Sequence, residues 1–274
     1  MKAYRQDVII LAVSAFIVFV LNIPFWQRFF SAVAPKSIPE WLFVASAGIG
    51  LLLLTNLMLT AIAHRPVFRV VMAVVLPLTA AASYFMYEYG VVIDDNMVRN
   101  VFETNSAEAQ DLVSPSMIAA IAAFGALPAY LIWRTPWIER TQSENLRANL
   151  KIAAISIPLV LATLFPFWGN YLSTFREFRE LRMTLTPLNY ISATAKYLGS
   201  GTAVASTVVA PFGEDAKRAA AVSGAKRKSL FVIVVGETAR ADHFGLNGYN
   251  RATSPELAKI DGLINFPQAF SCGT

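Results

Sequence analysis

The stretch FVIVVGETAR, residues Phe231–Arg240, places an acid directly after a run of β-branched and aromatic side chains. Continuous apolar runs of this kind, here Leu230–Val235, are typical of strands buried on both faces of a largely parallel sheet. Gly236 allows a tight turn, so Glu237 lies at the carboxyl edge, where open α/β sheets bind ligands. The stretch therefore predicts the first strand of an α/β domain with a candidate functional acid at its end.

A second polar turn lies downstream, at Ser271-Cys272-Gly273-Thr274. Ile264–Phe270 predicts a short strand before it, and Ser254-Pro255-Glu256 predicts a helix start, with a cap residue followed by proline. A hydroxyl such as that of Thr274 at the start of a following helix faces unpaired N–H groups, which suits a phosphate. Thr274 and Glu237 are therefore candidates to share a metal ion. So few βα units cannot bury both faces of a parallel sheet, and we expect the natural protein to continue past Thr274.

The composition indicates that much of the chain lies in a bilayer. Hydrophobic residues make up 55% and charged residues 15% of the 274 positions, whereas soluble domains carry about 25% charged residues. Lys and Arg exceed Asp and Glu by five, but the basic residues are scattered at helix ends and form no stripe or reader motif. This pattern favours membrane anchoring and excludes nucleic-acid binding.

Five apolar stretches have the length of about 20 residues that a spanning helix needs. They are Val8–Trp26, Trp41–Ala63, Val67–Tyr89, Met117–Trp133 and Ile152–Trp168. The first is too long for a signal peptide and ends in aromatic residues, so we expect it to be retained as a spanning helix. Prolines within these stretches are compatible with packed spanning helices.

The loop charges predict an orientation. One set of loops and termini holds eight basic residues, Lys2, Arg5, Arg65, Arg69, Arg134, Arg140, Arg147 and Lys151. The short loops of the other set hold three, Arg28, Lys36 and Arg99. Positive residues stay inside, so we expect a cytoplasmic N-terminus and a C-terminal part outside the membrane, which in a Gram-negative cell would be the periplasm.

The segment after the last span, Tyr171–Leu198, carries apolar residues at helical spacing with charges between them. It predicts one amphipathic helix, either lying in the membrane interface or packed on the soluble domain. Gly199–Lys228 has no apolar period and predicts a linker. The expected domains are therefore residues 1–170, a five-helix transmembrane domain; 171–228, the bridging helix and linker; and 229–274, the start of an α/β catalytic domain.

A polar cluster precedes the fourth span on the predicted outer side. Asn100, Thr104 and Glu108 are spaced by four, so on one helix they share a face that presents an amide, a hydroxyl and a carboxylate. We expect these residues to bind a lipid headgroup; the alternative is a polar helix that faces water. The single cysteine, Cys272, is either a buried free thiol or one half of a disulfide whose partner lies beyond this chain.

The strings VVGETARADHFGLNGYNRATSPEL and NFPQAFSCGT, residues 234–257 and 265–274, closely resemble the lipid phosphoethanolamine transferases of Gram-negative inner membranes. That family includes lipid A modifying enzymes and the mobilised colistin resistance enzymes, within the alkaline phosphatase–sulfatase superfamily. Five spans, a bridging helix and a periplasmic domain with an alkaline-phosphatase-like α/β fold match its layout.

The resemblance assigns roles to individual residues. It implies that Glu237 and Thr274 bind Zn²⁺, and that Thr274 is the nucleophile that carries a covalent phosphoethanolamine intermediate. The remaining zinc ligands and the partner of Cys272 would lie downstream. Asn100, Thr104 and Glu108 match a substrate-contacting stretch, whereas the Asp-His pair after GETARA is implied to be structural.

The resemblance also implies the reaction. The whole protein, expected to be a monomer, would transfer phosphoethanolamine from phosphatidylethanolamine to lipid A or another envelope glycolipid. This transfer would lower the negative surface charge and confer polymyxin resistance, whereas residues 1–274 alone would be inactive. Alternatives are a glycerol-phosphate transferase of the lipoteichoic acid synthase type, a membrane sulfatase and, without catalysis, a membrane scaffold or transporter. The near absence of ionisable residues in the spans disfavours a transporter.

Overall fold

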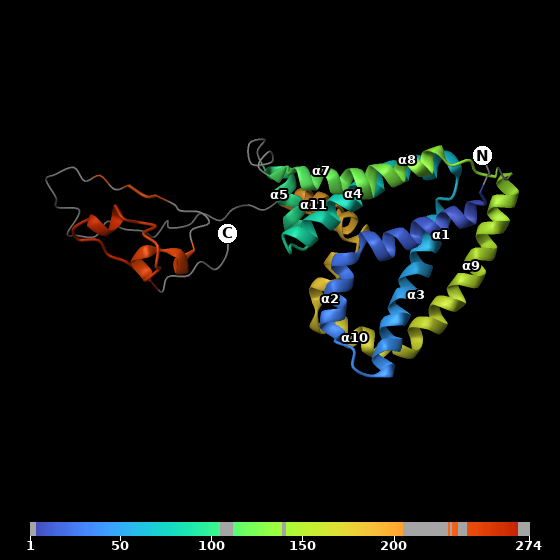
Figure 1. Ribbon diagram of the computed structural model, residues 1–274, viewed down its shortest axis with the longest axis horizontal. Coiled ribbons are helices and arrows are strands. Elements are labelled where there is room, and N and C mark those ends of the chain that lie inside the picture. Colours follow the sequence, from blue (N-terminus) through green and yellow to red (C-terminus); the bar gives the residue numbers. More distant parts are fainter. Residues whose placement is uncertain are drawn as a thin grey trace. The chain divides into compact units, whose positions relative to one another are not determined.

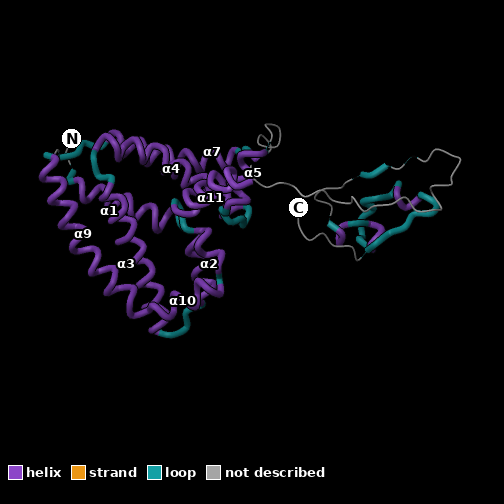
Figure 2. Tube along the Cα trace, turned by 180° about the vertical axis from the view of Figure 1, so that it is seen from behind, coloured by secondary structure: helices purple, strands orange, loops and turns teal. Residues whose placement is uncertain are grey.

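The computed structural model describes residues 4–104, 112–138, 141–204, 230, 232–234 and 240–267. The chain divides into two compact units, residues 1–208 and 209–274. Every α-helix in the described ranges belongs to the first unit (Figure 1). The second unit consists of loops and short 3₁₀ turns in its described part (Figure 2).

Four helical segments in the described part are long and apolar enough to cross a bilayer. Two are single helices, α3 (Ile38–Ala61) and α4 (Arg65–Glu88). The third joins α7 (Pro115–Ile121), the π-helical turn η2 (Ala122–Ala126) and α8 (Leu127–Arg134). The fourth joins α9 (Gln142–Leu164), the 3₁₀ turn η3 (Phe165–Phe167) and α10 (Trp168–Glu177). These segments confirm the last four predicted spans.

The first predicted span, Val8–Trp26, is not one straight helix. Helix α1 (Gln6–Phe16) continues as the π-helical turn η1 (Ile17–Leu21), and after Asn22 the helix α2 (Ile23–Val33) leaves at an angle of 61° (Figure 1). Pro24 lacks a backbone N–H and cannot continue a helix through this point. The amide of Asn22 donates to the carbonyl of Ile17 at 2.9 Å and closes the last turn of the first arm. The bent pair is the fifth candidate span.

The prediction of one amphipathic helix over Tyr171–Leu198 is wrong. Helix α10 ends at Glu177, the 3₁₀ turn η4 (Arg179–Thr184) follows, and α11 (Leu188–Val204) begins after Pro187. The backbone leaves the helical region at Phe178, with ψ of 70°. Leu181 in η4 is 1% exposed and packs in a cluster with α2 and the start of α3. The apolar side of this segment is therefore covered by the helical bundle itself, and α11 extends into the predicted linker.

Spans of the first unit approach each other closely at one glycine. Helix α4 packs along α7, η2 and α8, and α3 packs along α9. A Cβ atom on Gly125 in η2 would lie 2.6 Å from the Cα of Pro77 in α4. Since this distance is well inside van der Waals contact, the two backbones touch, and any side chain at position 125 would push the two helices apart.

The second unit does not confirm the predicted α/β fold. Its described elements are three 3₁₀ turns, η5 (Ala241–His243), η6 (Gly245–Asn247) and η7 (Leu257–Lys259). No described residue is in a strand, and Leu230 and residues 232–234 are exposed. A buried parallel strand needs neighbours on both sides, so the strands at Leu230–Val235 and Ile264–Phe270 remain predictions. The helix start predicted at Ser254 leads only into the single turn η7.

Candidate functional site

Two of the three predicted headgroup residues lie on the short helix α5 (Asp95–Glu103) and its end. Asp94 begins the helix, where its carboxylate accepts a hydrogen bond from the N–H of Met97 at 2.8 Å. Thr104 ends it, because its backbone turns to an extended conformation, with ψ of 131°. Its N–H donates to the carbonyl of Asn100 at 2.8 Å, and its hydroxyl donates to the same carbonyl. Asn100 and Thr104 are therefore brought together as predicted.

Helix α5 ends at Glu103, so the predicted face is described only for Asn100 and Thr104. Glu108 itself lies outside the described residues.

Helix α11 fixes the orientation of α5. The rings of Phe102 and Tyr197 stack with centroids 5.3 Å apart and an interplanar angle of 3°. Lys196 lies 3.9 Å from the carboxylate of Asp95, and Val98 is buried in a cluster with α11. Positions 95, 98 and 102 share one helical face. Asn100 lies about 160–200° around the helix from Val98 and Phe102 and is exposed, so it is directed away from α11.

A charged pocket of about 210 Å³ lies between the start of α5, η4 and α11. Two acids, Asp94 and Asp95, and two bases, Arg182 and Lys196, line it. Two of these groups already pair across the pocket, since Lys196 lies 3.9 Å from the carboxylate of Asp95. The sequence did not reveal it, because its acids and bases are far apart in the chain. The one local signal is Asp94 ahead of an amphipathic helix, which is an N-cap pattern.

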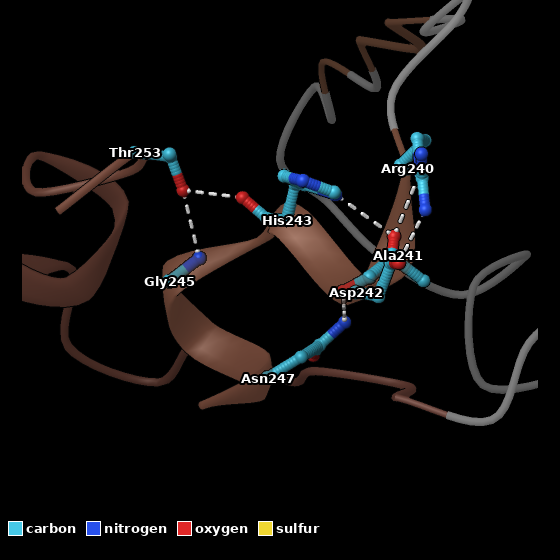
Figure 3. A network of polar contacts seen from close by, with 7 residues as sticks. All are labelled: Arg240, Ala241, Asp242, His243, Gly245, Asn247 and Thr253. Atoms are coloured by element: carbon cyan, nitrogen blue, oxygen red, sulfur yellow. Dashed lines mark hydrogen bonds and ion pairs between the residues drawn. The ribbon is translucent and has the colours of Figure 1, made fainter. Parts of the chain in front are cut away.

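In the second unit, the residues after the GET string form a polar network (Figure 3). The guanidinium of Arg240 donates to both carboxylate oxygens of Asp242, at 3.0 and 2.6 Å. His243 Nδ1 lies 3.1 Å from one of these oxygens. The hydroxyl of Thr253 donates to the carbonyl of His243 at 2.9 Å and accepts from the N–H of Gly245 at 2.8 Å.

In this network, Asp242 and His243 take part in contacts within the protein. The Arg240 guanidinium, and then His243, hold the pKa of the Asp242 carboxyl well below its usual range. The same ion pair raises the pKa of Arg240. Because both oxygens of Asp242 already accept hydrogen bonds, the geometry agrees with the expectation that this pair is structural.

The predicted metal ligands Glu237 and Thr274, the second of which is also the predicted nucleophile, lie outside the described residues, as does the predicted disulfide cysteine, Cys272. Within the described ranges no group of three or more His, Cys, Asp or Glu side chains could hold a metal ion. The chemistry of the predicted donors can still be compared with zinc. A carboxylate and a hydroxyl oxygen are acceptable zinc ligands, but a closed site has four. The two residues therefore fit as part of a zinc shell.

Two families match the chain. Residues 51–201 match the family described as Phosphoethanolamine transferase EptA/EptB, and residues 229–274 match the family described as Sulfatase. The first match contains α5, the charged pocket and most of α11. The second contains the GET string and Thr274.

Individual relatives agree with these matches. The phosphoethanolamine transferase EptA of Escherichia coli strain K12 is 35% identical over 258 residues, covering 93% of this chain and 46% of that protein. The phosphatidylethanolamine transferase Mcr-1 from Escherichia coli is 33% identical over 281 residues, covering 99% of this chain and 51% of that protein.

A solved structure extends the likeness to the fold. It is the integral membrane lipooligosaccharide phosphoethanolamine transferase A of Neisseria meningitidis, with a TM-score of 0.80 and 27% identity. The alignment covers 94% of this chain and 47% of the other. The chain thus spans about half the length of the relatives it matches. Since the EptA/EptB match extends over more than half of the residues of this chain, the chain belongs to the EptA/EptB family of phosphoethanolamine transferases.

Proposed function

We propose that the whole protein transfers phosphoethanolamine from phosphatidylethanolamine to lipid A or a related envelope glycolipid. The observation that carries this proposal is the succession of an EptA/EptB-type helical bundle and a sulfatase-type segment along one chain. The bundle would lie in the inner membrane with a cytoplasmic N-terminus, and the second unit would work in the periplasm. Transfer places an ammonium group on the acceptor, which lowers surface negative charge and would confer polymyxin resistance.

In the proposed first step, the Thr274 oxygen attacks phosphorus in the donor. The bond between phosphorus and the diacylglycerol oxygen breaks, and this oxygen takes up the proton that balances the one lost by Thr274. Phosphoethanolamine then remains on Thr274 as a phosphodiester-linked group until an acceptor oxygen attacks phosphorus. In that second step the bond between Thr274 and phosphorus breaks, the acceptor loses its proton, and the threonine hydroxyl is restored.

Threonine is a poor nucleophile at neutral pH, so its hydroxyl needs activation. Glu237 and Thr274 are proposed to supply two oxygen ligands to zinc. A bound zinc ion lowers the pKa of a coordinated hydroxyl and stabilises negative charge on phosphoryl oxygens. Glu237 would suit this role if it follows the predicted apolar strand, because the end of such a strand would hold its carboxylate in a fixed position.

The residues at the end of α5 are proposed to bind the donor headgroup. The exposed Asn100 can hydrogen-bond phosphate or glycerol oxygens, and Thr104 lies next to it, joined through the Asn100 carbonyl. The carboxylate of Glu108 can pair with the donor's ammonium group. The charged pocket between α5 and α11 is a neighbouring surface of mixed sign.

The test is mass spectrometry of the full-length, zinc-loaded protein in lipid nanodiscs. With phosphatidylethanolamine, we expect a phosphoethanolamine adduct on the peptide that contains Thr274. Thr274→Ala should abolish the adduct and turnover, whereas Thr274→Ser keeps a hydroxyl and should retain part of both. Turnover without any adduct would remove the covalent step. A glycerophosphate adduct formed only from phosphatidylglycerol would instead support the lipoteichoic-acid-type alternative.

A further inference from the structure

A cavity of about 310 Å³ lies in the first unit where the bent first span meets α4 and the α7–η2 segment. This volume is at the lower end of the range for small-molecule sites, about 300–1,000 Å³. Its walls include Val20 from η1, Pro24 from α2, Ala80 from α4, Ala120 from α7 and Phe124 from η2. Most of the lining is apolar, and none of its described lining residues carries a charge.

The cavity is surrounded by departures from regular helix geometry. The π-helical turn η1 and the 61° bend at Asn22 form one wall. The second π-helical turn, η2, forms the opposite wall. Pro77 lies within α4 one turn before Ala80. Because α2 leaves the axis of α1 at the bend, the two helices do not run parallel along α4. The cavity lies between η1, α2 and α4. π-helical turns inside helices occur frequently at functional sites.

One end of the cavity is polar. Tyr84 lines it, and the Tyr84 hydroxyl lies 3.1 Å from the hydroxyl of Ser114 and 2.8 Å from that of Ser116. The two serine hydroxyls are 2.9 Å apart. These three hydroxyls lie toward the end of α4 from which the chain continues to α5. Of these three residues only Tyr84 lines the cavity, and the two serine hydroxyls lie next to it through their bonds to Tyr84. An apolar cavity bordered by hydroxyls at one end matches the layout of an amphiphile.

We propose that this cavity holds one acyl chain of the glycerophospholipid donor, with the ester oxygens of that lipid at the hydroxyls of Tyr84, Ser114 and Ser116. The inference rests on the proposed function, because it identifies the lipid as the donor. Two of its walls belong to α4 and the α7–α8 segment, which are long and apolar enough to be spans, so the proposal places the cavity in contact with lipid. A neutral lining excludes a soluble ionic ligand and suits an acyl chain with its uncharged ester groups.

Bilayer tails are as apolar as the cavity walls, so the hydrophobic effect gives an acyl chain little preference for the cavity over the surrounding bilayer. The preference comes from packing against fixed walls and from hydrogen bonds to the hydroxyls. The cavity is therefore expected to increase the apparent affinity of the protein for a long-chain donor. Phosphoryl transfer takes place on the headgroup, so the rate at saturating donor should not change.

The test uses the full-length protein in nanodiscs that contain phosphatidylethanolamine with a photoreactive group in one acyl chain. Crosslinks are expected on the lining segments of α4 and α7. Ala120→Trp fills the cavity from α7 and should remove these crosslinks. It should also raise KM for the long-chain donor about fivefold, equivalent to ~1 kcal/mol, with kcat unchanged. Val20→Phe fills the cavity from the opposite wall and provides a second variant if the first does not fold.

The cavity variants Ala120→Trp and Tyr84→Phe each have a matched control. Ala119→Trp introduces the same side chain at the neighbouring exposed position outside the cavity, and should leave crosslinks and KM unchanged. Turnover of a dihexanoyl donor, whose chains are too short to fill the cavity, should not respond to Ala120→Trp. Tyr84→Phe should weaken crosslinking, whereas Tyr130→Phe, outside the cavity, should not.

The possible outcomes distinguish a failure of the acyl-chain site from a failure of the proposed transfer reaction. Crosslinks spread evenly over lipid-facing positions, or identical effects of Ala120→Trp and Ala119→Trp, overturn the acyl-chain site. Equal crosslinking by a photoreactive phosphatidylglycerol overturns the assignment to the donor. Crosslinks confined to the cavity in a protein without transferase activity support the site and reject the proposed function.

Discussion

The buried side chain of Asn22 pairs with the backbone of Thr186, 164 positions later in the chain. Its amide donates to the Thr186 carbonyl at 2.9 Å, and its oxygen accepts from the Thr186 N–H at 2.8 Å and from the Thr186 hydroxyl at 3.1 Å. The side chain thus completes the hydrogen bonds of two irregular segments at once, the bend of the first span and the link between η4 and α11. These two segments are fixed to each other by one residue.

Asn22→Leu should destabilise the helical unit. Leucine leaves the Thr186 N–H and the carbonyls of Ile17 and Thr186 without this partner, and a buried unsatisfied polar group costs ~1–3 kcal/mol. We expect a melting temperature several degrees lower in detergent. Asn170→Leu, an exposed position in α10, is the control. Equal melting temperatures for the two variants would show that the Asn22 bonds do not contribute to stability.

Phe102→Ala should loosen α5 and weaken donor binding without changing the chemistry. The stacked pair of Phe102 and Tyr197 holds the face of α5 opposite Asn100, and aromatic pairs contribute ~0.5–1.5 kcal/mol beyond their buried area. We expect faster amide hydrogen exchange in α5 and a higher KM for the donor, with kcat retained. Val101→Ala, at the exposed neighbouring position, should have neither effect. A fall in kcat alone would contradict a positioning role for Phe102.

Glu108→Ala in the full-length protein should weaken the use of the donor lipid. Loss of one charge-assisted hydrogen bond to the ammonium group should raise KM roughly ten- to a hundredfold, since such bonds contribute ~1.5–3 kcal/mol. The matched control is Glu103→Ala, which removes an exposed acid on α5 that faces Arg99 at 4.0 Å. Unchanged turnover at limiting lipid in the Glu108 variant would reject its role in headgroup binding.

Glu237→Gln should reduce the zinc content of the purified full-length protein, because it replaces a carboxylate ligand with a neutral amide. Elemental analysis measures this directly, without reference to activity. Glu256→Gln removes an exposed acid from the second unit that pairs with Lys259, and should retain zinc. Full zinc content in the Glu237 variant would show that this carboxylate is not a ligand.

Asp242 should stabilise the segment after the GET string in a pH-dependent way. Its pKa in the folded protein lies below its unfolded value of about 4. The stabilisation is therefore complete above the unfolded pKa and is lost as pH falls through the folded pKa. Asp242→Asn should increase hydrogen exchange over residues 240–253 at neutral pH, and its difference from the parent protein should shrink below pH ~4. Asp261→Asn, a second exposed acid, is the control.

The sequence was sufficient to predict the spans, because their signal is the length of an apolar run. It did not predict the two interruptions. Leu172, Phe175, Phe178 and Leu181 keep a helical spacing although the backbone departs from the helix at Phe178. Asn22 is one of two polar residues in the first apolar run, and its partner Thr186 is contributed by a distant segment. Pro24 is a local signal for the bend, but the hydrogen bonds that hold the bend depend on a residue far along the chain.

The sequence predicted only those parts of the candidate site that depend on the spacing of neighbouring residues. The spacing of Asn100 and Thr104 correctly placed them side by side, but it did not indicate that α5 ends at Glu103. The contact between Phe102 and Tyr197 depends on packing between α5 and α11 and could not be read from either helix alone. The roles of Glu108, Glu237, Cys272 and Thr274 remain predictions.

Because the backbones at Gly125 and Pro77 are in contact, the residue at position 125 determines how closely these two spans can pack. Any side chain at position 125 would have to push the whole of α4 away, since its obstacle is the Pro77 Cα and not a movable side chain. That displacement would widen the neighbouring cavity wall at Ala80 without altering any residue that lines it. Directed evolution toward donors with bulkier or branched tails should therefore accumulate replacements at position 125, a site that no lipid is expected to touch.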